Sequence, residues 1–136
     1  MKYSVHRQIT VALENVPGRL ASICEILSEH GINIEGICVI DNVEQGVVRL
    51  LTTHPAQTKS LLTEQDIYTV EADVLVLELM DQRGILAKIS AALAAQKINI
   101  DYLYGSFHRT GTRTMLILKV SDLAGAQRVL DEMDVK

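Results

Sequence analysis

The sequence contains one pattern twice, at a constant spacing of 66 residues. When positions 8–35 are aligned with positions 74–101, nine pairs are identical, and all but one of them are apolar residues or glycine. Two unrelated amphipathic helices would also share leucines, but they would not also share a glycine and an Ile-Asn-Ile ending. A self-match at one fixed period therefore indicates a duplicated structural unit. The identical pairs are Leu13/Leu79, Gly18/Gly84, Leu20/Leu86, Ala21/Ala87, Ile23/Ile89, Leu27/Leu93, Ile32/Ile98, Asn33/Asn99 and Ile34/Ile100.

The duplication predicts two small units, residues 1–72 and 73–136, with a boundary near Ala72. In the first unit, alternating apolar residues over 9–14 predict a strand, and Pro17 suits the first turn of the helix that follows. An apolar stripe at helical spacing continues to Gly31, which ends that helix. The other predicted elements are strands at 32–40 and 47–53 around a turn at 41–46, a helix from 54 to about 64, and a strand at 67–72.

The second unit follows the same order, but its last strand is largely missing. A strand at 74–80 precedes a helix at 85–96, and strands at 98–108 and 112–120 form a hairpin. Ser121 is the predicted N-cap of a final helix. The fold class predicted from this order is α+β, with two tandem ferredoxin-like βαββαβ units and antiparallel sheets.

Several predicted strands are apolar on both faces, which is typical of strands that are buried on both sides. "VLVLEL" at 74–79 and "MLILKV" at 115–120 are examples. The second sheet face then needs a cover, which is the other unit, a second copy of the chain, or both. The missing last strand leaves an open edge along 74–80, which residues 2–7 or a partner chain would fill. We expect a homodimer.

Charge and composition exclude several classes of function. The formal net charge is −4, so no general basic surface is present, and we expect no nucleic-acid partner. No apolar run approaches the ~20 residues that cross a bilayer, so we expect no membrane partner. The start of the sequence lacks the features of a signal peptide, and two cysteines do not make a disulfide framework. These features are typical of a cytoplasmic protein.

No arrangement of residues predicts catalysis, a metal or a cofactor. The four histidines lie on different segments and have no metal-ligand spacing. Cys24 falls on the stripe of the first helix and Cys38 in an apolar strand, where both are typical core residues. No nucleophile is accompanied by a base, and no glycine-rich phosphate loop is present. We therefore expect no catalytic residues, no metal ligands and no cofactor.

The segment "LENVPGRLASICEILSEHGINIEGI" resembles the signature of the ACT-domain family. The resemblance covers nearly the whole chain, as two ACT units in tandem. It implies ferredoxin-like units that associate through their sheets and bind amino acids or other small effectors at unit interfaces, beside the first strand-to-helix loop. Family members regulate enzymes of amino-acid metabolism, either fused to the enzyme or as separate subunits. The chain is most similar to the stand-alone tandem type.

The resemblance also implies ligand-binding positions. In members that bind serine, two asparagines contact the ligand, and they correspond here to Asn15 and Asn33. A family histidine corresponds to Leu13, which removes one contact for serine. In the second unit, Asp81 replaces the first asparagine while Asn99 is retained. The full candidate set is Asn15, Val16, Pro17, Gly18, Arg19, Leu20, Asn33, Ile34, Asp81, Gly84, Ile85 and Asn99.

Elementary chemistry gives these positions two interpretations. Backbone N–H groups at a helix start attract a carboxylate, Gly18 and Gly84 allow close approach, and an asparagine amide can meet either end of a zwitterion. The same residues would also serve simply as turn and strand-entry residues. Because Asp81 repels carboxylates, we expect the two sites to differ, with the first unit the better one.

We therefore expect a non-enzymatic regulatory protein that binds an amino acid and changes its assembly in response. The alternative is an interaction subunit of a metabolic enzyme, with a degenerate effector site and an apolar sheet face or open edge as its docking surface.

Overall fold

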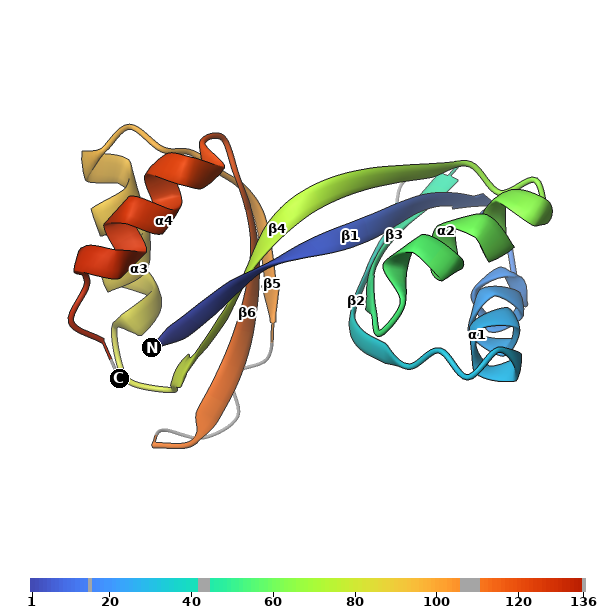
Figure 1. The fold of residues 1–136 in the computed structure, drawn as a ribbon, viewed down its shortest axis with the longest axis horizontal. Helices are drawn as coiled ribbons and strands as arrows, with labels where there is room; N and C mark the ends of the chain where they lie inside the picture. Colours follow the sequence, from blue (N-terminus) through green and yellow to red (C-terminus); the bar gives the residue numbers. More distant parts are fainter. Residues whose placement is uncertain (15, 42–44, 106–110, 136) are drawn as a thin grey trace. The chain divides into compact units, whose positions relative to one another are not determined.

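A computed structural model describes residues 1–14, 16–41, 45–105 and 111–135 (Figure 1). Each half of the chain has its helices and strands in the predicted β-α-β-β-α order, and the α+β class is confirmed. The elements are β1 (Lys2–Glu14), α1 (Arg19–Glu29), β2 (Ile34–Ile40), β3 (Gln45–Thr52), α2 (Pro55–Glu64), β4 (Thr69–Met80), α3 (Ile85–Ala95), β5 (Ile100–Gly105), β6 (Arg113–Val120) and α4 (Leu123–Glu132).

The chain divides into two compact units, and the divisions along the sequence fall after His6 and after Ala72. The first unit is Arg7–Ala72, and the second unit combines Met1–His6 with Asp73–Lys136. The division departs from the predicted ranges in residues 1–6, which precede the first unit in sequence but group with the second. The two long strands, β1 and β4, therefore each contribute residues to both units.

In the first unit the strand order is β2-β3-β1-β4, which is the ferredoxin-like order. β3 pairs antiparallel with both β1 and β2. Helices α1 and α2 contact each other and cover the same sheet face. The core follows from the predicted periodicities, because alternate strand residues meet one stripe of each helix. Its buried members are Ile9, Val11, Ile23, Leu27, Ile32, Val48, Leu50 and Leu62.

In the second unit the order is β1-β4-β6-β5, so residues 2–6 of β1 lie where a fourth strand would stand. Of the two predicted occupants of the open edge along 74–80, the chain's own first residues and a partner chain, the structure has the first residues there. No strand follows α4 within the described part of the chain, which ends at residue 135. The core joins β4 and β6 to α3 and α4, which lie against each other (Figure 1). Its buried members are Leu75, Leu77, Leu79, Ile85, Ile89, Leu93, Ile98, Leu116, Leu118, Val120, Ala126 and Leu130.

Burial on both sheet faces was predicted for β4 and β6, and the structure agrees. Leu75 and Leu77 belong to the core beneath the helices, whereas Val74 and Val76 alternate with them on the other face and are also buried. Ile117 behaves in the same way on β6. The near-continuous apolar sequences of β4 and β6 therefore correspond to strands that are buried on both faces of the sheet.

Two local predictions are wrong. The strands predicted at 67–72 and 74–80 form one strand, because no glycine or proline interrupts the chain at exposed Asp73. Ser121 is not the N-cap of α4. The adjacent Asp122 takes that place, and its Oδ1 accepts from the N–H of Gly125 at 3.0 Å. The Ser121 hydroxyl instead accepts from the N–H of Asn99 at 2.9 Å.

No helix in the described segments is long and apolar enough to span a bilayer.

Candidate functional site

The turn before the first helix of each unit has the same backbone conformation. Gly18 has φ 91° and Gly84 has φ 79°, and both precede a helix that no side chain caps. Left-handed φ values favour glycine, which explains why the repeat preserves this residue. Asn15, the first residue of the implied ligand set, lies outside the described residues.

The two retained asparagines are held by matching backbone hydrogen bonds. The N–H of Asn33 donates to Thr53 Oγ1 at 3.1 Å, and the Thr53 N–H donates back to the Asn33 carbonyl at 3.0 Å. Asn99 has the same two bonds with Ser121, each at 2.9 Å. The Asn99 side chain also donates to Asp101 Oδ1 at 3.0 Å. Each asparagine therefore joins the entry of one strand to the exit of the next.

Within one unit, the glycine turn and the asparagine lie at opposite ends of the sheet. Glu14, just before the turn, pairs with Gln45 at the start of β3, whereas Ile34 pairs with Thr52 at its end. Eight strand residues separate these ends by roughly 20 Å. The second unit is built alike, with Met80 opposite Arg113 and Ile100 opposite Val120. A single unit therefore does not bring the two halves of the implied site together.

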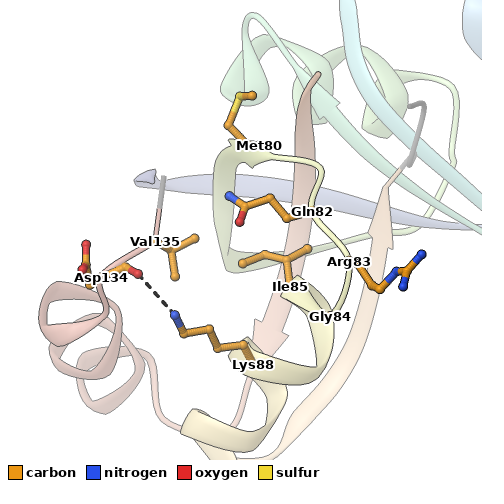
Figure 2. Close-up of a pocket in the computed structure, with 8 residues that line it drawn as sticks. All are labelled: Met80, Gln82, Arg83, Gly84, Ile85, Lys88, Asp134 and Val135. Carbon is orange, nitrogen blue, oxygen red and sulfur yellow. Dashed lines mark hydrogen bonds between the residues drawn. The ribbon is translucent and has the colours of Figure 1, made fainter. Parts of the chain in front are cut away.

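A pocket of about 460 Å³ lies beside the glycine turn of the second unit (Figure 2). Gln82 and Ile85 project into it from the turn and the start of α3, and Val135 closes it from the segment after α4. Lys88, one helical turn into α3, donates to the main-chain carbonyl of Asp134 at 3.3 Å. The lining residues are Met80, Gln82, Arg83, Gly84, Ile85, Lys88, Asp134 and Val135.

The first unit has a pocket of about 490 Å³ in the corresponding place. Four of its lining positions match the second pocket at the 66-residue spacing of the repeat, although none of the four residues is the same. Arg19 Nη2 forms an ion pair with Glu14 Oε2 at 3.2 Å across this pocket's rim. The corresponding pairs are Glu14/Met80, Arg19/Ile85, Ser22/Lys88 and Tyr68/Asp134.

The positions that the family resemblance implies for ligand binding lie in different parts of the two units. Arg19, Gly84 and Ile85 line the pockets. Val16 and Leu20 are exposed beside the first turn, and the backbone of Asp81 bonds to residues 111 and 112. Pro17 stands in the first turn, and Ile34 starts β2 beside Asn33, at the far end of the sheet.

Sequence reasoning missed Met80, Gln82, Lys88 and the segment after α4. The repeat had placed Met80 and Lys88 opposite Glu14 and Ser22, but a search for identical pairs passes over positions that differ. Only the folded unit shows that the segment after α4 reaches the glycine turn.

Within the described ranges, no group of three or more histidine, cysteine, aspartate and glutamate residues could hold a metal ion. Cys24 and Cys38 are free thiols of intermediate exposure.

Three comparisons place this fold among known proteins. A plant D-3-phosphoglycerate dehydrogenase (isoform 3, chloroplastic, of Arabidopsis thaliana) is 30% identical over 115 residues, or 84% of this chain. The chain spans only 17% of the length of that enzyme. A crystal structure of a Bacteroides thetaiotaomicron protein matches 98% of this chain and 92% of its own, with 25% identity and a TM-score of 0.90.

A third match is the ligand-free regulatory subunit of aspartate kinase from Thermus thermophilus, with a TM-score of 0.69. It is 16% identical, covers 97% of each chain, and therefore shows a shared fold. The family model described as an ACT domain pair matches residues 4–135. A duplicated βαββαβ unit with a glycine turn before each first helix, matched over almost its full length, places this chain in the ACT domain pair family.

Proposed function

We propose that the protein is a non-enzymatic regulatory module that binds a free amino acid and changes its assembly when the ligand is bound. The observation that carries the proposal is the pocket that recurs in both units beside the glycine turn. Each pocket combines charged or amide side chains with a helix start, which are the groups that recognise a zwitterion.

The relatives support the regulatory part of this proposal. The Thermus thermophilus match is named as a regulatory subunit of aspartate kinase, an enzyme that acts on an amino acid. The plant relative is named as a dehydrogenase, but this chain corresponds to a small part of it. The function of a regulator therefore fits this chain better than the activity of either enzyme.

The geometry of one unit suggests why a ligand would affect assembly. The glycine turn and Asn33 lie roughly 20 Å apart, too far for one amino acid to touch both within a unit. A ligand held by a turn and an asparagine together would need them from two chains, as in the homodimer that we propose. Ligand binding and association would then be thermodynamically linked, so each would strengthen the other.

The test is isothermal titration calorimetry of the whole chain against the twenty amino acids, followed by sedimentation velocity with and without any ligand found. We expect heat from a small subset of amino acids and a change in sedimentation coefficient with that subset. No heat from any of the twenty at millimolar concentration would contradict the amino-acid proposal.

A second candidate function, an interaction subunit of a metabolic enzyme, is favoured by the exposed strand β2. Ile37 and Val39 are 42% and 55% exposed on this edge strand. An apolar sheet edge is a common docking surface for another chain. Stoichiometric co-purification of one enzyme, in the absence of amino-acid binding, would favour this candidate over the first.

A further inference from the structure

We propose that the pocket of the second unit is selective for an amino acid with an aliphatic side chain, and that Lys88 binds its carboxylate. This inference rests on the proposed function, because it specifies the ligand class of one of the two pockets. It departs from the sequence-based expectation that the first unit holds the better site.

Lys88 supplies a positive charge to the pocket, whose lining also includes the acidic residue Asp134, and no ion pair of Lys88 is recorded among the described residues. In the described part of the chain, its recorded polar contact is a long hydrogen bond of 3.3 Å to the neutral carbonyl of Asp134. Figure 2 shows the ammonium group of Lys88 pointing toward Asp134, whereas Arg83 points away from the other labelled side chains. A ligand carboxylate would give Lys88 a shorter, charge-assisted hydrogen bond in place of a weak one.

The opposite wall of the pocket is apolar. Ile85 is a buried core residue, and Met80 and Val135 are half-buried beside it. These three side chains would contact an aliphatic group and remove it from water, which favours binding. The Gln82 amide, which faces the same space, offers an acceptor for the ligand ammonium group. A cavity of about 460 Å³ has the size of a small-molecule site.

The pocket of the first unit also has apolar lining residues, among them Leu13, Ile26 and Ile67, but it has no lysine at the position of Lys88. Ser22 stands where the second unit has Lys88, and Glu14 stands where it has Met80. The one cation at this pocket's rim with a recorded ion pair, Arg19, is already bound to Glu14. A ligand carboxylate would compete with Glu14 for Arg19 here, whereas no ion pair of Lys88 is recorded among the described residues. The difference in cations therefore favours the pocket of the second unit as the one that binds the carboxylate of the ligand.

The test compares ligands and variants by calorimetry on the whole chain. Leucine, valine or methionine should bind more tightly than serine or aspartate, and isoamylamine, which lacks the carboxylate, should not bind. Lys88→Gln should weaken leucine binding about tenfold or more, which is typical of a lost hydrogen bond to a charged group. Lys2→Gln removes the same charge from an exposed lysine of the same unit that does not line the pocket, and it should leave binding unchanged.

The outcomes separate this inference from the broader proposal. If no amino acid gives binding heat, the proposed function itself is overturned. Leucine binding that survives Lys88→Gln, or tighter binding of serine or aspartate than of leucine, overturns only the assignment to this pocket. A second variant, Val135→Asp, places a negative charge on the apolar wall and should also weaken leucine binding. Thermal unfolding of each variant, expected to match the parent chain within a few degrees, shows that the fold is intact.

Discussion

At the scale of single residues, Tyr3 links β1 to α4 in the second unit. Its hydroxyl donates to Asp131 Oδ1 at 2.5 Å, and its ring packs against the core. The hydrogen bond to Asp131, followed by burial and the negative charge of Asp131, raises the pKa of Tyr3 above its usual value of 10.0. The folded state thus holds the Tyr3 proton more strongly than the unfolded state does.

A raised pKa in the folded state gives a stabilisation that is complete below pH ~10 and disappears as the pH rises through the folded pKa. We therefore predict that Tyr3→Phe is less stable than the parent chain at pH 8, and that the difference shrinks above pH 10. Urea unfolding at several pH values measures this difference. Asp131→Asn should restore an ordinary tyrosine titration at 295 nm. A stability difference that stays constant up to pH 11 would contradict the assignment.

Residues that the repeat preserves and residues that it varies have different roles. Ile23 and Ile89 are both fully buried, and Gly18 and Gly84 share one backbone conformation. Lys88, by contrast, faces the pocket at a position where the first unit has Ser22. Residues that are identical in the two repeats are therefore those that the fold requires. Pocket residues that differ between the repeats indicate that the two units would bind different ligands.

At the scale of elements, β5 lies unusually close to β6 at Gly105. A Cβ atom at this position would lie 2.4 Å from the Met115 carbonyl oxygen and 2.9 Å from Leu116 Cδ2. Because a backbone atom cannot move aside cheaply, Gly105→Ala should force the strands apart and destabilise the protein by about 1–3 kcal/mol. Urea unfolding measures the change.

The matched control for Gly105 is Gly46, the second residue of β3 in the first unit. A Cβ atom there would meet its nearest neighbour, the Ile40 carbonyl oxygen, at an ordinary 3.5 Å. Gly46→Ala should therefore change the free energy of unfolding by less than ~1 kcal/mol. Equal losses for both alanine variants would show that loss of glycine flexibility, not the close approach at β5, determines the effect.

Sequence periodicity predicted the order and type of the elements except that it divided β4 into two strands, and it did not predict where strands end or what they pair with. Every second residue of β4 is apolar at Val70, Ala72 and Val74. This regular pattern therefore does not show that the boundary between the units lies within the strand. The N-cap was predicted one residue early because Ser121 and Asp122 have equally suitable side chains. The pairing of Asn99 with Ser121 decides between them, and that contact is set by the folded hairpin.

The candidate site was less predictable than the fold for a related reason. The glycine turns followed from the repeated motif, whereas the segment after α4 carries no motif and reaches the pocket only through tertiary packing. The distance between the turn and Asn33 is likewise a property of strand register, which a local pattern does not contain.

At the scale of the whole molecule, the second unit depends on residues that precede the first. Residues 2–6 lie beside β4, and without them that strand would present an unpaired edge. We predict that a fragment of residues 73–135 alone is poorly folded or aggregated, and that a synthetic peptide of residues 1–8 restores its structure. Circular dichroism and thermal unfolding of the fragment with the peptide measure the rescue. A scrambled peptide of the same composition is the control, and a fragment that is fully folded alone would contradict the prediction.

The exposed edge strand β2 provides a test of the proposed homodimer. Val39 on β2 pairs with the buried Val48 on β3. The apolar surface of the sheet therefore extends to its edge strand, where Val39 is exposed. A lysine on an edge strand opposes pairing with another chain, because association would bury its charge. We therefore predict that Val39→Lys lowers the fraction of dimer in sedimentation equilibrium at micromolar concentration. Val70→Lys is the matched control, since Val70 is 47% exposed but lies on β4, at the opposite side of the first unit's sheet from β2. The control variant should leave the fraction of dimer unchanged. An equal loss of dimer in both variants would show that the interface does not lie specifically at β2. A parent chain that is monomeric at every concentration would contradict the homodimer.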